Sequence, residues 1–416
     1  MKIAIIGSGI SGLVAAHKLH KEHDITVFEA NDRIGGHTHT VGVRDSDQMV
    51  GVDTGFIVYN ETTYPYFTKL LRELEVETQP TEMSFSVTCR KSGLEYNGSS
   101  LRQLFVQKRN IFRPSFYRMI REILRFNRLT AEVFATPNDT RTIREFVTEY
   151  HFQPQFIDHY LVPLGASLWS CSASKFLDFP LSLVVRFLEN HGMNTVDNRP
   201  EWRVIKGGSQ KYVDKIIRPF ADRILVNTPV RSIRRTDTSV EITAANRAVE
   251  EFDHVVVACH SNQALRMLAD PSPVENEMLS EFPYQANKVF LHTDTAILPK
   301  RKKAWASWNY HIPQEPQKNV SVTYDMNILQ TLKTEEVYCV TLNDSFPIRS
   351  DSVIKEIDYE HPLYTVKGME AQNRHHELIN QNRTSFCGAY WGNGFHEDGV
   401  RSALAVVEGL RQEVLV

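Results

Sequence analysis

Short apolar runs that end in glycines or polar residues mark the strands of this chain. Lys2–Ile6 is such a run, and a helical pattern over Leu13–Leu19 and a second strand over Ile25–Phe28 follow it. Together these elements predict a βαβ unit within about thirty residues. Later strands and a last helix are expected over Ile224–Ile233, Val240–Ala244, His254–Ala258, Ser385–Cys387 and from Asp398 onward. Elements of one α/β domain therefore lie at the start, past the middle and at the end of the chain.

The intervening stretches predict a second domain that is inserted twice. The first stretch looks mixed and then helical, with helices expected over Arg118–Ala131, Thr142–Tyr150 and Pro154–Tyr160. The second contains strand-like runs over Lys288–His292, Val320–Tyr324 and Val337–Leu342. A chain of 416 residues is long enough for two domains. We therefore predict an α/β protein with one discontinuous domain, 1–85, 200–265 and 371–416, and an inserted α+β substrate domain, 86–199 and 266–370.

Composition narrows the range of functions. The net charge of −3 argues against general nucleic-acid binding, because no positive field gathers phosphates. The five cysteines lie far apart and form no CxxC pair, which predicts no disulfide framework and suits a reducing cytoplasm. No run of about 18 apolar residues is present, so no transmembrane helix is expected. His37 and His39 alternate in HTHT, but no third ligand follows at a suitable spacing, so no metal site is expected.

The strongest local motif is GSGISG, which joins the first strand to the first helix. Gly7 allows the tight turn, Gly9 lets the backbone approach a pyrophosphate, and Gly12 lets helix and strand pack closely. The start of the helix then offers free N–H groups to the phosphates. Glu29 ends the second strand, where a carboxylate can accept hydrogen bonds from ribose hydroxyls. The motif therefore predicts a dinucleotide site.

A second pair of glycines favours FAD over NAD. Gly35 and Gly36 come shortly after Glu29, where they let another backbone segment reach the diphosphate, and Arg33 adds a positive charge. An ordinary NAD domain has no need of this segment. A Gly-Gly surface turn is the alternative interpretation.

Longer motifs resemble the FAD-dependent amine-oxidase superfamily of glutathione-reductase-type flavoproteins. They are GSGISG with EANDRIGGHTHT, VDTGFIVYN (Val52–Asn60), WRVIKGGSQKYV (Trp202–Val213) and FCGAYWGNGFHEDGVRSALA (Phe386–Ala405). NTPVRSI and VVVACHSNQAL fit the same order, so the resemblance covers the whole chain. It implies a Rossmann-like FAD-binding domain with an inserted substrate domain, and hydride transfer from a substrate C–H bond to flavin N5.

The resemblance also implies which residues contact the cofactor. His37 stands where many relatives have arginine and Ala389 where an acid often holds the ribitol, so contacts there differ in detail. Cys387 lies in the wrong place for the covalent flavin linkage of amine oxidases, so non-covalent FAD is expected. The implied FAD contacts are Gly7, Gly9, Ser11, Gly12, Glu29, Ala30, Arg33, Gly36, His37, Thr38, Gly55, Phe56, Val230, Gly388, Glu397, Gly399 and Val400.

Further motifs resemble a bacterial flavoprotein group associated with cyclopropane-fatty-acid synthases. They are VDTGFIVYNETTYPYF, EMSFSV, GLEYNGSSL, WSCSASKFLDFP, ACHSNQAL and GFHEDGVRSALA. One branch of the group is linked to desaturation of methyl-branched fatty acyl chains on the way to furan fatty acids. The resemblance implies a fatty acyl or phospholipid substrate and a synthase of this kind as a partner. Two alternatives stay open: an amine oxidase, and a non-catalytic flavoprotein accessory to the synthase.

Four residues are candidates for the substrate side of the flavin. Lys288 falls near the place where monoamine oxidases have a lysine at N5, although a surface lysine at the start of a strand explains it equally. Tyr59 follows the segment expected under the flavin. Trp391 and His396 lie in the loop before the last helix. In amine oxidases a pair of aromatic residues encloses the amine, and Trp391 is a candidate for one of them; the same aromatic loop equally suits the site of a lipid tail.

Two stretches are both basic and aromatic. Residues 108–128 contain seven lysines and arginines, a single acid, and apolar residues at helical spacing. Residues 300–308 begin with four basic residues and include two tryptophans. Such stretches suit an anionic lipid surface, whereas an ordinary surface helix with snorkelling arginines gives the same pattern. If they share one face, we expect peripheral contact with the inner face of the membrane.

Overall fold

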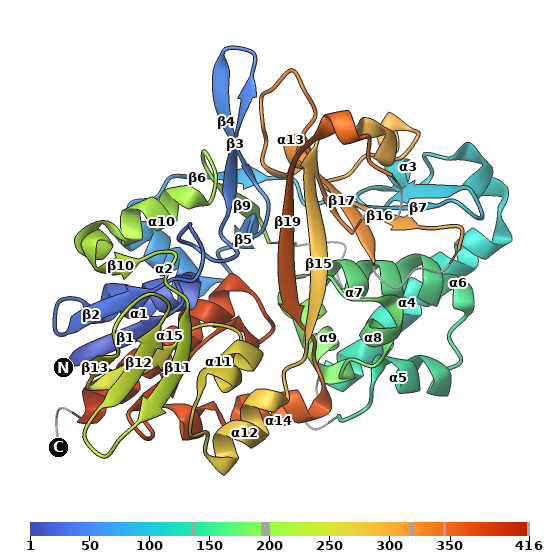
Figure 1. Ribbon diagram of the computed structural model, residues 1–416. Helices are drawn as coiled ribbons and strands as arrows, with labels where there is room; N and C mark the ends of the chain where they lie inside the picture. Colours follow the sequence, from blue (N-terminus) through green and yellow to red (C-terminus); the bar gives the residue numbers. More distant parts are fainter. Residues whose placement is uncertain (135–138, 193–199, 316–319, 344–346, 414–416) are drawn as a thin grey trace.

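A parallel sheet of five strands lies at the left of the computed structural model in Figure 1, and its strands come from distant parts of the chain. The structure describes residues 1–134, 139–192, 200–315, 320–343 and 347–413. The strands follow one another across the sheet in the order β10 (Ile224–Leu225), β2 (Asp24–Phe28), β1 (Lys2–Ile6), β14 (His254–Val257) and β20 (Thr384–Phe386). Because all neighbouring strands are parallel, their carboxyl ends meet at one edge.

Side chains of β1 alternate between the two faces of this sheet. Ile3 and Ile5 belong to one apolar cluster and Ala4 and Ile6 to another, because successive side chains of a strand point in opposite directions. The first face packs against α1 (Ile10–Leu19), α2 (Pro65–Glu73), α10 (Gln210–Ile216) and α15 (His396–Glu413). The second packs against the antiparallel strands β11 (Val230–Arg235), β12 (Val240–Ala244) and β13 (Glu250–Phe252), with α11 (Ser261–Met267), α12 (Pro273–Ser280) and α14 (Val366–Asn373).

A larger sheet of seven strands begins in the middle of Figure 1 with two long strands and extends to the right. Its order is β19 (Val353–Pro362), β15 (Tyr284–His292), β18 (Cys339–Leu342), β17 (Ser321–Asp325), β16 (Trp308–Ile312), β7 (Phe85–Cys89) and β8 (Leu94–Asn97). Neighbours are antiparallel except β16 and β7. Short α13 (Met326–Leu329) follows β17.

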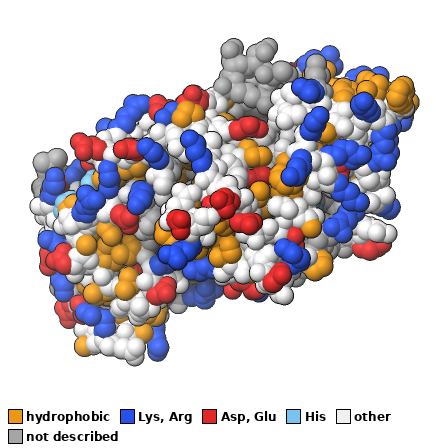
Figure 2. Space-filling view, turned by 90° about the horizontal axis from the view of Figure 1, so that it is seen from above, with side chains coloured by type: hydrophobic (Ala, Val, Ile, Leu, Met, Phe, Trp, Pro, Cys, Tyr) orange, Lys and Arg blue, Asp and Glu red, His pale blue; other side chains and the backbone are white. Residues whose placement is uncertain are grey.

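Helices form the right-hand part of the molecule beside this sheet (Figure 1). They are α3 (Leu101–Leu104), α4 (Pro114–Phe134), α5 (Ile143–Glu149), α6 (Pro154–Phe156), α7 (Val162–Leu168), α8 (Ala173–Leu177) and α9 (Leu181–Asn190), with a π-helical turn at Ile157–Leu161. Two small antiparallel sheets lie between the large ones: β3 (Thr40–Asp45) with β4 (Gln48–Asp53), and β5 (Val58–Asn60) with β9 (Trp202–Ile205) and β6 (Thr78–Thr81). Seen from above, lysine and arginine side chains gather at the right-hand end (Figure 2). Among the described helices, none is long and apolar enough to cross a membrane.

The structure confirms the βαβ unit and the last strand and helix, and it corrects two other expectations. The single strand expected over Ile224–Ile233 is wrong, because the chain turns at Asn227, which has a φ of +50°, and β10 and β11 belong to different sheets. The edge strand β19 was not expected, because its sequence VIKEIDYEHP contains no apolar run. The strands of the five-stranded sheet come from the segments assigned to the first domain, and those of the seven-stranded sheet come from the segments assigned to the inserted domain. The one exception is Phe85, which begins β7 but was assigned to the first domain. The domain boundaries themselves stay a prediction.

Candidate active site

A cavity of about 860 Å³ runs from the carboxyl edge of the parallel sheet to the seven-stranded sheet. At the first end it is lined by the turn after β1 and by residues at the end of β2. At the other end it is lined by side chains of β15, β16, β17 and β18 and of α7 and α9. Ligands of open α/β sheets bind at the carboxyl edge, so this cavity is the expected place for a dinucleotide.

The three glycines of GSGISG each occupy a place where a side chain would interfere or where space is left for a ligand. Gly7 has a φ of +103°, and a Cβ there would lie 2.9 Å from the Ala258 carbonyl oxygen. A Cβ on Gly12 would overlap the Gly7 carbonyl oxygen, so α1 packs directly against the turn. A Cβ on Gly9 would meet nothing within 4 Å, because Gly9 faces the cavity. This cradle fits a diphosphate.

The start of α1 leaves its amide groups available to a ligand. Gly9 is the N-cap, no side chain caps the helix, and its first turn contains no acid. Gly9, Ile10 and Ser11 line the cavity, and the positive end of the helix dipole favours an anion at this place. Ser11 also donates a hydrogen bond of 3.0 Å to the Gly399 carbonyl, which joins the turn to α15.

Glu29 is held with its carboxylate on the cavity wall at the end of β2. Oε2 accepts hydrogen bonds from the Ser8 amide at 3.0 Å and the Ser8 hydroxyl at 2.5 Å. Oε1 accepts from the Asn31 amide at 2.8 Å and its side chain at 2.9 Å. Each carboxylate oxygen has further acceptor capacity. A buried carboxylate oriented in this way fits the ribose diol of the adenosine half of FAD.

The second pair of glycines brings another backbone segment to the same cradle. Gly36 has a φ of +59°, and a Cβ there would lie 2.9 Å from the Gly9 Cα. The Gly35 amide donates to the Ser8 carbonyl at 3.1 Å. Arg33 lines the cavity beside them and donates to the Thr38 carbonyl at 3.2 Å. The two glycine segments therefore form one wall, which fits the diphosphate of FAD.

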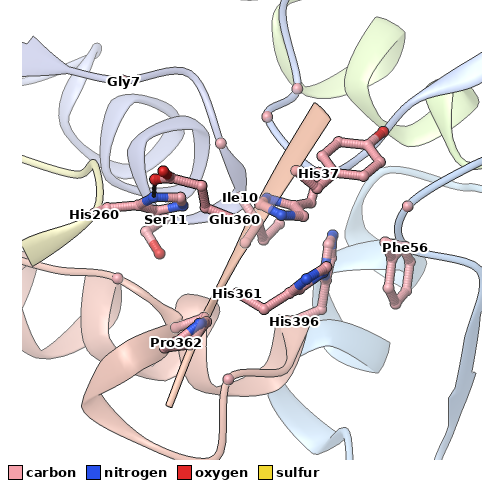
Figure 3. A pocket seen from close by; sticks show the side chains of 18 of the residues that line it. Gly7, Ile10, Ser11, His37, Phe56, His260, Glu360, His361, Pro362 and His396 are labelled. Carbon is pink, nitrogen blue, oxygen red and sulfur yellow. Dashed lines mark ion pairs between the residues drawn. The ribbon is translucent and has the colours of Figure 1, made fainter. Parts of the chain in front are cut away.

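Three histidines from distant segments meet on the cavity wall next to this cradle (Figure 3). The ring centroid of His37 lies 5.3 Å from that of His361 and 6.0 Å from that of His260. Glu360 reaches His260 at 3.5 Å. Burial lowers the pKa of His37 and of His361 to about 3 and that of His260 to about 4. All three are neutral at pH 7, and the Nε2 atom of His37 is buried with no hydrogen-bond partner among the described residues.

His260 and His361 were not predicted as site residues. His260 follows β14, which pairs with β1, so its position at the carboxyl edge beside GSGISG was a usable signal. His361 and Glu360 lie on β19, the strand that the sequence pattern did not indicate. Their place in the site depends on pairing between residues far apart in sequence.

His396 is a candidate catalytic residue that the structure places on the cavity wall. It begins α15, and its ring is stacked on Phe56 with centroids 3.5 Å apart. Nε2 lies 3.0 Å from the Thr38 hydroxyl and 3.1 Å from the Tyr212 hydroxyl. Burial holds the pKa of His396 well below its usual range. These contacts fix a neutral imidazole in one orientation.

The structure places the other three candidates for the substrate side away from the cavity. Lys288 is exposed and pairs with Glu356 at 2.9 Å, because side chains alternate along β15 and its neighbour Val289 faces inward. Tyr59 is buried in the core against α2 instead of lining the cavity. Trp391 stacks on His375 with centroids 4.3 Å apart and lies behind the wall. These three placements correct the sequence-based expectation.

The residues implied as FAD contacts divide into a wall and a supporting layer. The first group lines the cavity: Gly7, Gly9, Ser11, Glu29, Ala30, Arg33, Gly36, His37, Gly55, Phe56, Val230 and Gly388. The second lies behind it: Gly12, Thr38, Glu397, Gly399 and Val400. Glu397 accepts hydrogen bonds from the amides of Tyr66 and Phe67 at 3.0 and 2.9 Å, so it caps the start of α2 instead of facing a flavin. Val400 packs in the core beside α1.

The far end of the cavity is apolar. Among the described residues, none that α7, α9, β16, β17 or β18 contributes to the wall carries a charge. The acidic residues that line the cavity are Glu29, Asp358 and Glu360, which lie on or next to β2 and β19. We call this the apolar end, and it comprises Met83, Leu168, Phe187, Val289, Trp308, Tyr324, Leu329, Val340, Leu342 and Phe395.

Comparisons with known proteins agree with this geometry. Residues 10–410 match the family described as flavin containing amine oxidoreductase. The flavin-containing amine oxidase A of Canis lupus familiaris is 26% identical over 68% of this chain, and the match spans 54% of that relative. A lysine-specific histone demethylase 1B homolog of Caenorhabditis elegans is 27% identical over 66% of this chain and 34% of its own length. The chain therefore spans about half, or less, of these curated relatives.

Solved structures share the fold over the whole chain. Cyclohexylamine oxidase from Brevibacterium oxydans has a TM-score of 0.72 at 17% identity and covers 100% of this chain and 99% of its own. A fatty acid isomerase from P. acnes that produces CLA has a TM-score of 0.66 at 15% identity, covering 98% and 97%. The fold is thus a Rossmann-like FAD-binding domain with a substrate domain, and FAD is the cofactor. The chain belongs to the flavin-containing amine oxidoreductase family.

Proposed function

We propose that this oxidoreductase desaturates a fatty acyl chain, methyl-branched and esterified in phospholipid. The observation that carries the proposal is the uncharged, apolar end of the cavity. An acyl chain offers no hydrogen-bonding groups along its length, so a wall of aliphatic and aromatic side chains is the surface that it requires. The resemblance to flavoproteins associated with cyclopropane-fatty-acid synthases supports the same substrate. The likeness to a fatty acid isomerase supports an acyl substrate for this fold.

The side chains of the cavity have distinct parts in this reaction. Bound FAD supplies the hydride acceptor at its N5 atom. Phe56 and His396 form a stacked pair on the cavity wall, and the hydroxyls of Thr38 and Tyr212 hold the imidazole in place. The apolar end holds the chain and excludes water from the reacting carbon atoms. Two C–H bonds of the acyl chain break and one C=C bond forms; the hydride would go to FAD and the proton to solvent.

A second candidate, oxidation of a small apolar amine, is favoured by the loop before α15. Tyr390 and Phe395 of this loop both line the cavity, and Phe395 stacks on Phe187 with centroids 4.8 Å apart. Aromatic faces attract an ammonium group. A polyamine fits less well, because the acidic side chains of the wall lie on or next to β2 and β19 and not at the apolar end.

Anaerobic reduction of the bound flavin tests the proposal. The purified protein is mixed with phospholipid that carries methyl-branched acyl chains, with phospholipid that carries straight chains, or with cyclohexylamine. We expect loss of the visible flavin absorbance with the branched lipid and a product lighter by two hydrogens. Loss with the amine alone would replace the proposal by the second candidate. A flavin that none of the three compounds reduces would contradict both candidates and favour a non-catalytic accessory role.

A further inference from the structure

The basic residues of this chain are concentrated at one end. Residues 90–128 and 300–303 together contain 14 of the 47 lysines and arginines but only 2 of the 50 acidic residues. Both acids, Glu95 and Glu122, are buried. The rest of the chain has a clear excess of acid, although the net charge of the whole is only −3. Figure 2 shows this end on the right, with many lysine and arginine side chains beside a hydrophobic patch.

Strand β8 joins the two basic stretches. The Glu95 carbonyl accepts a hydrogen bond of 3.5 Å from the Asn110 side chain. The Glu95 carboxylate accepts from the Lys300 amide at 3.1 Å and from the Arg301 guanidinium at 2.7 Å. The stretches, almost 200 residues apart in sequence, therefore form one surface. We call residues 108–128 with 300–303 the basic end.

Large apolar side chains are exposed in the same place. Phe112 is 84% exposed, more than any other large hydrophobic residue among those described. Ile111, Tyr117 and Leu124 are exposed by 46%, 47% and 60%. Burying such side chains in an apolar phase is favourable, and keeping them in water is not. Their presence at the most basic part of the surface indicates a partner that is both apolar and anionic.

The outer face of α4 combines the two properties. Tyr117, Arg121, Leu124 and Arg128 follow each other at intervals of four, three and four residues, so they lie along one exposed face. Arg121 and Arg128, like Arg118, form no ion pair among the described residues. Their charge is therefore available to an external partner.

We propose that the basic end docks on a membrane surface of anionic lipid, with Phe112 and Leu124 among the acyl chains and the arginines and lysines at the headgroups. An amphipathic helix with basic residues beside aromatic and aliphatic ones binds such an interface. A nucleic acid would pair with the arginines but would leave Leu124 and Ile111 in water. The inner side of α4 packs against α9, whose Phe187 lines the apolar end of the cavity. Docking does not depend on the substrate, so its test needs no activity measurement.

Co-sedimentation of the FAD-bound protein with lipid vesicles tests the proposal. We compare vesicles of phosphatidylcholine with vesicles of equal parts phosphatidylcholine and phosphatidylglycerol. We expect binding to the anionic vesicles that weakens as salt is added, because each basic residue near such a surface contributes about fivefold in affinity. The variant R118E/R121E and the variant K302E/K303E should each lose at least about twentyfold. Phe112→Ala should lose about tenfold and leave the salt dependence unchanged.

Matched variants on the other domain serve as controls. Lys69 and Lys211 are exposed on α2 and α10, so K69E/K211E changes the net charge by the same amount far from the basic end. Met49 is 68% exposed on the β3–β4 hairpin, and Met49→Ala is the control for Phe112. Both controls should bind as the parent does, with flavin absorbance and circular dichroism unchanged in every variant. Equal losses in the controls, undiminished binding of the basic-end variants, or binding of duplex DNA but not of vesicles would each overturn the proposal.

Discussion

Replacing Glu29 with alanine tests two roles of one carboxylate, and two measurements separate them. In the structure the group accepts four hydrogen bonds, two from Ser8 and two from Asn31, and it lines the cavity. The first role is structural, because the buried Ser8 amide and hydroxyl depend on Oε2. The second is the expected binding of the FAD ribose, for which both oxygens have remaining acceptor capacity. Glu29→Ala removes both roles together, and each is measured in a different state of the protein.

The expected sizes follow from the contacts. Leaving buried donors of Ser8 without an acceptor costs about 1–3 kcal/mol of apo-protein stability. Losing charge-assisted hydrogen bonds to ribose hydroxyls weakens FAD binding by a further 1–3 kcal/mol or about 5- to 150-fold in Kd. Glu29→Gln keeps a neutral acceptor but presents an amide to some of the present donors, so we expect intermediate losses. Glu61→Ala is the control, because Glu61 is exposed and pairs with Arg72 outside the cavity.

The assay uses protein stripped of FAD. Its free energy of unfolding is measured in urea, and its Kd for FAD is measured by quenching of flavin fluorescence. We expect Glu29→Ala to lower the free energy of unfolding and to raise the Kd for FAD. Glu29→Gln should change both in the same directions but less, and Glu61→Ala should change neither. A lower stability with an unchanged Kd would refute the ribose role and leave Glu29 as a support for the turn after β1.

Three further outcomes are expected. Lys288→Met should keep turnover within about twofold, because the Lys288 ammonium pairs with Glu356 on the outer face. Val289→Asp should lower the rate of flavin reduction by lipid at least tenfold, about 1.4 kcal/mol in the barrier, while flavin absorbance shows that FAD stays bound. Equal effects of the two substitutions would place the substrate elsewhere. The stability of the apo-protein should fall as the pH drops from about 6.5 toward 4. Burial lowers the pKa values of His37, His260 and His361 to about 3–4, so the unfolded chain binds protons at a higher pH than the folded chain. The difference in melting temperature between the parent and a variant with glutamine at all three positions should change with pH only in that range. Acid precipitation should release the yellow colour into the supernatant if FAD is held without a covalent bond, and colour retained in the pellet would contradict this.

The sequence predicted those parts of the site that depend on local geometry. The turn after β1 needs glycine because of sterics between neighbours, at Gly7 with its positive φ and at Gly12 with no room for a Cβ. Such constraints act between residues close together in the sequence, so they can be predicted without a structure. Glu29 lines the cavity for the same reason, since it follows the strand next to β1, and its contact with FAD stays a prediction.

The substrate side could not be predicted in this way, because it depends on register and on long-range pairing. Lys288 and Val289 are adjacent, yet only the second faces the cavity, and a strand shifted by one residue would exchange them. Tyr59 and Trp391 lie next to wall residues but point into the core, where large aromatic side chains are most often found. The cluster of His37, His260 and His361 combines three segments that meet only in the folded chain.

Positive charge is sparse in the cavity and abundant on the outer surface of the basic end, and the difference has a physical reason. The cations that line the cavity are Arg33, Arg231 and Arg266, and its other walls offer backbone amides, glycines and neutral histidines. Amides at the start of α1 bind a diphosphate without bringing a mobile charge near the apolar end. A free lysine in that cavity would be costly to bury beside an acyl chain. The basic side chains of the basic end lie instead on the outer surface, where α4 presents Arg121 and Arg128 beside Leu124.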